Sequence, residues 1–419
     1  MSKETLKLKH PDGVIHATVQ LTGSKSESNR ALILNALSKG KVRIENLSHA
    51  DDTVTLKNAL DLANKHAQEQ TLIDIGPAGT AMRFLTAYLT LAKGRFELTG
   101  SDRMKQRPIG ILVDALGQLG AHIDYAAVTG YPPLYITGGF EQTNKNIDMK
   151  GDVSSQYLSA LLLVAAFLPK GLCLNITSTL TSKPYVTMTL DMLREVGIHH
   201  LWEGNQIMIH NQDVQDAVLT IEPDWSAASY WYAIIALSPV GSKLFLPGLK
   251  DHSLQGDRAI VDIMKNFGVR STFKDAGIEI ENTGQIIGER FFDFKACPDL
   301  AQTVISCCAA LGYNARFTGL ETLKIKETDR ILALQNELSK FHVSLIEEAD
   351  QIYYLNTDAK INRSGVSIQT YEDHRMAMAF APLAIVFDGL IIEDAEVVGK
   401  SYPTFWQHLT DIGFHCIPQ

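Results

Sequence analysis

The chain repeats one pattern of helices, turns and strands along its 419 residues, and this repetition limits the folds that are open to it. In each copy a small or polar cluster opens an apolar helix and a glycine turn follows. A strand, a second amphipathic helix and a closing strand complete the copy. Six such clusters occur, at residues 23–26, 78–81, 152–155, 224–227, 297–300 and 371–374.

After a shorter first interval the clusters are roughly 70 to 75 residues apart, which exceeds the ~20–50 residues of a solenoid repeat. Any α/β protein alternates helices and strands. That alternative does not account for the glycines at matched positions after the six helices: Gly40, Gly94, Gly171, Gly241, Gly312 and Gly389. We therefore predict an α/β fold built from six copies of a βαβ-type unit.

A chain of 419 residues exceeds the size of one hydrophobic core, so we expect two domains with three units each. The stiff Glu222-Pro223 turn suits a crossover between them. We predict a discontinuous domain from residues 1–20 plus 224–419, an inserted domain from residues 21–223, and hinges near 20–22 and 221–225. Because helix N-termini carry positive partial charge, two faces that each present three of them would form a cleft for a heavily anionic ligand.

The composition is ordinary for a globular protein, and its net charge of -9 argues against a nucleic-acid binder with a broadly basic surface. A locally basic cleft remains compatible with that charge. The first residues contain no apolar signal segment, and the longest apolar run, residues 158–168, is too short to span a membrane. We expect a soluble cytoplasmic protein that contacts neither membrane nor nucleic acid.

The five cysteines show no paired spacing and no accompanying histidine pattern, so we predict neither disulfides nor a metal site. We expect all of them to be buried small apolar residues in a reducing compartment: Cys173, Cys297, Cys307, Cys308 and Cys416.

The first cluster gives the strongest sign of anion binding. Residues 23–30 place a small-residue turn, hydroxyls and the cations Lys25 and Arg30 at a helix start, where free N–H groups suit an anion. Ser26 and Arg30 lie one turn apart on the same face. A capped helix with solvated cations is the alternative for this segment taken alone.

The second and third clusters offer similar groups. Gly79 leaves backbone N–H groups bare for an approaching anion, and Ser154, Ser155 and Gln156 put hydroxyls and an amide before an apolar helix. A loop between them holds three close cations, Arg103, Lys105 and Arg107. Taken alone, the serines could simply cap the helix and the loop could simply be solvated.

The later clusters add carboxylates. At 326–330 either Thr328 or Asp329 can cap the following helix, which leaves Lys326, Glu327 and Arg330 at its start; a surface ion-pair group is the alternative.

Asp299 and the Asp373-His374-Arg375 string also open helices, where a carboxylate is usually a cap, and Lys400 would by default be an exposed loop lysine. The argument for function is joint, because nearly every cluster carries groups suited to a phosphate or to proton transfer.

Together these strings resemble the signature motifs of 5-enolpyruvylshikimate-3-phosphate (EPSP) synthases, a family of enolpyruvyl transferases. The matching strings are residues 23–26 with 29–32, 78–83, 103–105 with 107–108, 326–330 and 373–377, and the resemblance runs from Leu21 to Pro403. It implies two domains of three βαββαβ units each, arranged as inverted α/β barrels with a cleft between the domains.

The resemblance also implies a reaction of aromatic amino acid biosynthesis. The enolpyruvyl group of phosphoenolpyruvate is transferred to the 5-hydroxyl of shikimate 3-phosphate through a tetrahedral intermediate, and phosphate is released. No metal or organic cofactor takes part, and a monomer is expected. Because the two substrates bring several negative charges together, such a reaction needs a preorganised cationic cage.

Carried over by motif, the resemblance assigns residues to each substrate. Shikimate 3-phosphate would be held by Lys25, Ser26, Arg30, Ser154, Ser155, Gln156, Ser182, Tyr185, Asp299, Thr322 and Lys326. Phosphoenolpyruvate would be held by Lys25, Gly79, Arg103, Gln156, Arg330, Arg375 and Lys400.

The same resemblance implies three catalytic residues. Asp299 would be the base for the 5-hydroxyl and Glu327 the proton donor to the methylene carbon, while Lys25 would assist proton transfer and the leaving phosphate. Tyr185 would pack against the shikimate ring. Pro77, Phe84, Thr322 and residues 222–226 depart from the common family pattern, but none of these departures removes a catalytic group.

Three rival functions remain as alternatives. A UDP-N-acetylglucosamine enolpyruvyl transferase typically has Lys-Asn in the first motif and a reactive loop cysteine, whereas this chain has Lys25-Ser26 and no cysteine at 100–108. The presence of all three catalytic residues disfavours a non-catalytic two-domain anion-binding protein. The acidic net charge disfavours a relative that processes RNA ends.

Overall fold

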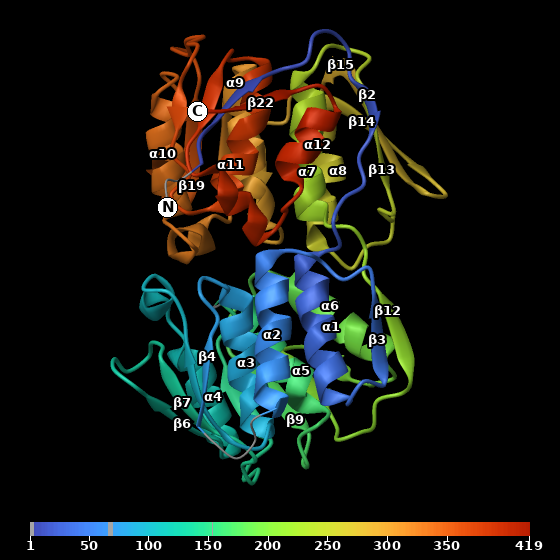
Figure 1. Ribbon diagram of the computed structural model, residues 1–419, viewed down its shortest axis with the longest axis vertical. Coiled ribbons are helices and arrows are strands. Elements are labelled where there is room, and N and C mark those ends of the chain that lie inside the picture. The colour runs from blue at the N-terminus through green and yellow to red at the C-terminus, as the bar shows by residue number, and fades with distance from the viewer. Residues whose placement is uncertain (1–3, 66–69, 153) are drawn as a thin grey trace. The chain divides into compact units, whose positions relative to one another are not determined.

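The computed structural model describes residues 4–65, 70–152 and 154–419, which divide into two compact units (Figure 1). The inserted unit is Gly23–Ile221, and the discontinuous unit combines Met1–Thr22 with Glu222–Gln419. Residues 1–3 of the predicted discontinuous domain and Val153 of the third cluster lie outside the described residues.

Three buried helices in mutual contact form the centre of the inserted unit: α1 (Lys25–Leu37), α3 (Gly79–Leu91) and α5 (Ser155–Ala165). The sequences of α3 and α5 are apolar on nearly all sides, which is why these helices lie inside. Each of the other helices buries one face only: α2 (Asp51–Lys65), α4 (Gly110–Leu119) and α6 (Lys183–Glu195).

The discontinuous unit has the same plan. Its central helices, which also contact one another, are α7 (Trp225–Leu237), α9 (Ala301–Leu311) and α11 (His374–Phe380). The other helices are α8 (Ile260–Lys265), α10 (Arg330–Ser339) and α12 (Phe405–Asp411). Short 3-10 turns complete both units: η1 (Met104–Gln106), η2 (Gly256–Ala259), η3 (Pro298–Leu300), η4 (Glu321–Ile325), η5 (Ala381–Ile385) and η6 (Ala395–Lys400).

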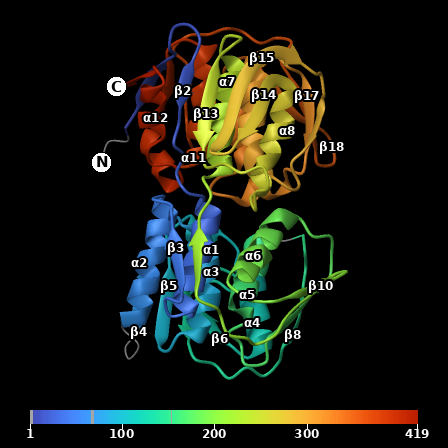
Figure 2. The same cartoon turned by 90° about the vertical axis from the view of Figure 1, so that its right-hand side faces the viewer.

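Five four-stranded sheets share one topology, in which a parallel pair is followed by two antiparallel neighbours. Figure 2 shows one of them, the sheet of β2, β13, β15 and β14. The inserted unit has β4-β5-β7-β6 and β8-β9-β11-β10, and the discontinuous unit has β2-β13-β15-β14, β16-β17-β19-β18 and β20-β21-β1-β22. In the inserted unit the strands are β4 (Gln70–Asp74), β5 (Arg95–Thr99), β6 (His122–Tyr125), β7 (Leu134–Thr137), β8 (Asn146–Met149), β9 (Leu172–Ile176), β10 (Leu201–Glu203) and β11 (Gln206–Ile209).

In the discontinuous unit the strands are β1 (Leu6–Lys9), β2 (His16–Thr18), β13 (Lys243–Pro247), β14 (Phe267–Lys274), β15 (Gly277–Ile286), β16 (Phe291–Asp293), β17 (Ala315–Thr318), β18 (Ser344–Ala349), β19 (Ile352–Asn356), β20 (Ser367–Ile368), β21 (Leu390–Ile392) and β22 (His415–Pro418).

The sixth sheet has two parallel strands, β3 (Val42–Glu45) and β12 (Ala217–Thr220). The first repeat is shorter than the others because, among the described residues, α2 is followed directly by β4, whereas a hairpin such as β6–β7 follows the second helix in later repeats. Strand β12 comes from the far end of the inserted unit, so the two ends of that unit meet in one sheet. In the discontinuous unit β1 likewise lies between β21 and β22, with Leu6 opposite both Ile392 and Pro418.

The predicted fold class is confirmed, since each predicted cluster stands at the start of a central helix and each unit has three of them. The prediction that all cysteines are buried is wrong for Cys173 and Cys416. Cys173 alternates with inward-facing residues of β9, and Cys416 lies on the edge strand β22. The apolar run at 158–168 extends three residues beyond the end of its helix at Ala165. Over the described ranges, none of the helices has the length and hydropathy needed to cross a membrane.

Candidate active site

The start of α1 holds Lys25 in a fixed position. Ser24 caps the helix by accepting a hydrogen bond from the Glu27 backbone N–H at 3.4 Å. The Nζ of Lys25 lies 3.2 Å from Oδ2 of Asp52, a carboxylate in the first turn of α2 that is only 3% exposed. The ammonium group itself is partly exposed, so Lys25 can meet a ligand while Asp52 anchors it.

Arg30 is buried among neutral hydrogen-bond acceptors. Its Nε donates to Thr189 Oγ1 at 2.8 Å, and its Nη2 donates to Ser159 Oγ at 3.1 Å and to the Tyr185 carbonyl at 3.2 Å. The Nη1 donates to the Ser26 carbonyl at 2.8 Å, one turn back on α1. Burial lowers the pKa of Arg30 to about 10, which still leaves the guanidinium charged at neutral pH.

Phe84 lies beside this guanidinium, with the Arg30 Cζ 5.5 Å from the centre of its ring. An aromatic face stabilises a cation at that distance. Phe84 departs from the family pattern, and the structure gives it a place: it supports the buried charge of Arg30.

Gly79, the first residue of α3, lies against Arg107. A Cβ at position 79 would lie 2.5 Å from Arg107 Nη1, so a side chain there would displace the guanidinium from its present position. The η1 turn directs Arg107 inward, where it is 8% exposed, whereas Arg103 is exposed. The sequence favoured Arg103, and its contact with phosphoenolpyruvate stays a prediction. Arg107 was missed because the loop cations are equivalent in sequence.

The start of α5 is joined to the start of α3. Ser154 caps α5 by accepting from the Gln156 backbone N–H, and Gln156 Nε2 donates to Thr80 Oγ1 at 3.1 Å. Ser155 is the first residue of α5. The amide that the sequence singled out therefore contacts the residue after Gly79 at the start of α3.

Ser182 and Tyr185 lie at the start of α6. Ser182 has a left-handed backbone with φ of 51°, an uncommon conformation for a residue with a side chain, and it is 7% exposed. Tyr185 accepts from Arg30 through its carbonyl. The structure thus brings these two predicted residues close to the Arg30 group.

In the discontinuous unit Arg330 is the centre of a charged cluster and is 2% exposed. Its Nε lies 2.6 Å from Asp373 Oδ2, its Nη2 lies 2.9 Å from Glu327 Oε2, and its Nη1 lies 3.3 Å from Asp299 Oδ1. Burial alone would lower the pKa of Arg330, but the three carboxylates raise it above its usual value. Arg330 is therefore permanently charged.

Asp299 joins Arg330 to a second arginine. Its Oδ2 lies 2.9 Å from Arg375 Nη2, and its Oδ1 lies 3.8 Å from Lys326 Nζ. Arg375 also donates to the Tyr230 hydroxyl at 3.2 Å and to the Asp299 carbonyl at 3.3 Å. Asp299 does not cap its helix, which overturns the default interpretation of a first-turn carboxylate.

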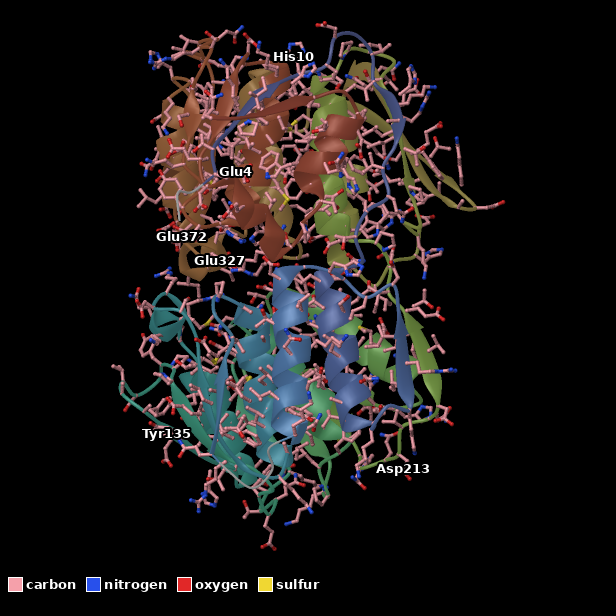
Figure 3. The ribbon with its side chains drawn as sticks, viewed as in Figure 1. Glu4, His10, Tyr135, Asp213, Glu327 and Glu372 are labelled. Atoms are coloured by element: carbon pink, nitrogen blue, oxygen red, sulfur yellow. The ribbon has the colours of Figure 1, made fainter. Side chains whose placement is uncertain are left out.

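Glu327, labelled in Figure 3, lies between η4 and α10 and joins Arg330 to Lys400. The Lys400 Nζ lies 3.0 Å from Glu327 Oε1, and Lys400 is 7% exposed, so the default expectation of an exposed loop lysine is wrong. Asp329, and not Thr328, caps α10, because its side chain accepts from the backbone N–H groups of two following residues.

Other site residues differ in how well the sequence marked them. Thr322 lies on η4 with its Oγ1 buried and without a hydrogen-bond partner among the described residues. The sequence did not mark Asp52, and it marked Asp373 only as a helix start. Their roles depend on partners that are distant in the chain, and the acidic first turn of α2 was the one local sign of Asp52.

Comparisons with known proteins show the family of the chain. Residues 10–409 match the family model of EPSP synthase (3-phosphoshikimate 1-carboxyvinyltransferase). The chain belongs to the EPSP synthase family. A member from Bacteroides fragilis (strain YCH46), named 3-phosphoshikimate 1-carboxyvinyltransferase, is 46% identical over 401 residues, which covers 96% of each chain. A member from Sulfurovum sp. (strain NBC37-1) with the same name is 35% identical and covers 98% of this chain and 99% of its own.

Solved structures share the fold of this EPSP synthase family member. EPSP synthase from Acinetobacter baumannii superposes with a TM-score of 0.76 at 19% identity and covers 99% of both chains. The enolpyruvyl transferase NikO from Streptomyces tendae gives a TM-score of 0.75 at 16% identity and covers 100% of this chain and 99% of its own.

Proposed function

We propose that this chain transfers the enolpyruvyl group of phosphoenolpyruvate to the 5-hydroxyl of shikimate 3-phosphate, with release of phosphate. Family membership supports the reaction. The observation that carries it to these residues is the cluster of the discontinuous unit, where Asp299 and Glu327 are each held by cations on both of their oxygens. Acid–base groups embedded among cations suit a reaction between two anions.

In this proposal the inserted unit holds mainly shikimate 3-phosphate. Ser26, Arg30, Ser154, Ser155, Gln156 and Ser182 supply hydroxyls, an amide and a guanidinium, and Tyr185 packs against the ring. The positive partial charge at the N-termini of α1 and α5 favours a phosphate. Gly79, Gln156 and Lys25 meet phosphoenolpyruvate, and the position of Arg107 beside Gly79 makes it a better contact than Arg103.

The discontinuous unit supplies the rest of the cage and the proton transfers. Lys326 and Thr322 contact shikimate 3-phosphate, and Arg330, Arg375 and Lys400 contact phosphoenolpyruvate. Asp299 takes the proton of the 5-hydroxyl as its oxygen bonds to C2 of phosphoenolpyruvate, while Glu327 gives a proton to C3.

Elimination then completes the reaction. A proton leaves the new methyl group, the bond from C2 to the phosphate oxygen breaks, and Lys25 stabilises the departing phosphate. The proton lost from C3 returns to Glu327, and the proton that Asp299 took from the 5-hydroxyl passes to the departing phosphate, so the enzyme returns to its starting state.

The organisation of the chain forms part of the proposal. We infer that residues 21–223 are an inserted domain with hinges near 20–22 and 221–225, and that residues 1–20 plus 224–419 form the other domain. We also infer that the protein is cytoplasmic and acts as a monomer. Analytical ultracentrifugation of the purified protein tests the monomeric state.

Phosphate release from the purified protein tests the function. Release should require phosphoenolpyruvate and shikimate 3-phosphate together, and either compound alone should give none. Release with UDP-N-acetylglucosamine in place of shikimate 3-phosphate would sink the assignment. The product, 5-enolpyruvylshikimate 3-phosphate, should appear in equal amount to phosphate by mass spectrometry.

A further inference from the structure

Asp257 is a buried carboxylate of the discontinuous unit with no part in the roles given above. It lies on η2 and is 4% exposed. The Ser226 hydroxyl donates to its Oδ2, and no described residue donates to its Oδ1. Burying a carboxylate with one neutral partner costs free energy. Stability therefore does not explain this residue.

A chain of hydrogen bonds leads from Asp257 to the charged cluster. Arg375 Nη2 donates to Ser226 Oγ at 3.4 Å, and the Ser226 hydroxyl in turn donates to Asp257. The same Nη2 lies 2.9 Å from Asp299 Oδ2. Ser226 thus lies between Asp257 and the arginine that faces the predicted base.

The backbone around Asp257 is held firmly against the start of α7. The Trp225 backbone N–H donates to Gln255 Oε1 at 2.9 Å, and Gln255 Nε2 donates to the Pro223 carbonyl at 2.9 Å. Because Gln255 is two residues from Asp257, these hydrogen bonds tie the segment that carries the carboxylate to the start of α7.

We propose that Asp257 is a positioning residue for the phosphoenolpyruvate site, acting through the Ser226 hydroxyl on the orientation of Arg375. The inference rests on the proposed function, in which Arg375 meets phosphoenolpyruvate. An ionised Asp257 accepts a hydrogen bond from the Ser226 hydroxyl, and the Ser226 oxygen can then accept from Arg375. A protonated Asp257 instead donates to that oxygen and competes with Arg375 for it.

The surroundings of Asp257 set the pH at which this change occurs. Burial and, after it, the charge of Asp299 raise the pKa of Asp257 to about 7. The charged and titratable groups that face it are Arg375 of α11, Asp299 of η3, Asp224 at the start of α7 and Cys297 before η3. On its own element Arg258 is engaged with Asp251 and Asp262. Asp257 is therefore ionised only above about pH 7, where Arg375 is held most firmly.

The test is steady-state phosphate release from about pH 5 to 9, with phosphoenolpyruvate varied at saturating shikimate 3-phosphate. Ser226→Ala should raise KM for phosphoenolpyruvate about tenfold, because a hydrogen bond to a charged group is lost, and leave KM for shikimate 3-phosphate unchanged. Ser226→Thr keeps the hydroxyl and should restore the wild-type value. Ser238→Ala is the control, because it removes a buried hydroxyl at the opposite end of α7, where it donates to the Ile234 carbonyl.

Asp257→Asn should raise the same KM and remove the rise of kcat/KM near pH 7 that the wild type shows. The double variant should be no worse than the more severe single one, because both changes break one chain. Asp257→Asn should also melt no lower than the wild type above pH 7, since it removes a buried charge.

Three results would overturn the inference: an unchanged KM in Ser226→Ala, additive effects in the double variant, or a pH profile that survives Asp257→Asn. If Asp257→Asn does not fold, the comparison of KM for phosphoenolpyruvate between Ser226→Ala and Ser226→Thr still tests the inference. A wild-type protein that releases no phosphate would overturn the proposed function, and this inference with it.

Discussion

Asp299 and Glu327 each pair with cations that are proposed to bind substrate, and each is also proposed to exchange a proton. The two roles are chemically linked. Asp299 pairs with Lys326, Arg330 and Arg375, whereas Glu327 pairs with Arg330 and Lys400. An arriving phosphate or carboxylate competes for these cations. A carboxylate that loses its cation becomes more basic, so substrate binding itself would prepare both groups to exchange protons.

At the residue scale, the two loop arginines give a matched pair of variants. Arg107→Ala should lower kcat/KM for phosphoenolpyruvate on the order of 100-fold, because removing one partner of a buried charge pair costs about 2–5 kcal/mol. Arg103→Ala should change it less than about threefold, because an exposed charge is screened. Phosphate-release kinetics of the two purified variants check this. A larger loss of kcat/KM in Arg103→Ala than in Arg107→Ala would show that Arg103, not Arg107, contacts phosphoenolpyruvate.

The sequence identified the loop of residues 103–107 but not the arginine that turns inward. Three cations in five residues look alike in sequence, and the η1 turn that separates them has no strong local signal. Lys400 shows the same limit, since its burial depends on Glu327, a partner far away in the chain. Residue types were therefore predictable, while their exposure depended on tertiary contacts.

At the scale of elements, the functional groups collect at the starts of the central helices. These helices are buried along their length, so their N-termini are the places where N–H groups and polar side chains can reach a ligand. Caps at four of these starts use one hydroxyl or carboxylate each: Ser24, Ser154, Asp224 and Asp373. This regularity is why the sequence pattern predicted helix starts well.

The cap of α10 makes a prediction at this scale. Asp329→Ala should lower the free energy of unfolding by about 0.5–2 kcal/mol, because two backbone N–H groups lose their acceptor. Urea unfolding followed by circular dichroism measures the change. Thr328→Ala is the control and should stay within about 0.5 kcal/mol of the wild type. Equal losses in the two variants would show that Asp329 is not the cap.

At the scale of the whole molecule, the repeats could be predicted from the sequence, but the strands that close each unit could not. Strand β12 pairs with β3, and β1 pairs with β21 and β22, across most of the length of their units. Such pairings leave no periodic signal, because each strand is short and its partner is remote. The number of repeats thus predicted three units in each half of the chain, whereas the strand pairs that join the ends of each unit were found only in the structure.

The inserted unit should fold alone. It has its own buried helices and joins both of its ends in one sheet, so residues 23–221 expressed without the rest should unfold cooperatively in urea. The matched control is residues 23–216, which lack β12 and leave β3 without its partner strand. That shorter chain should be clearly less stable. Equal midpoints for the two would mean that β12 does not close the unit.

The pairing of β1 also fixes an order of events during synthesis. The inserted unit has all of its strands once residue 221 has left the ribosome, but β2 must wait for β13, and β1 must wait for β21 and β22 near the end of the chain. For most of translation the first strand of the protein is therefore without its partner strands. Its alternation of lysines with leucines gives that waiting strand a charged face, which discourages pairing with the wrong partner.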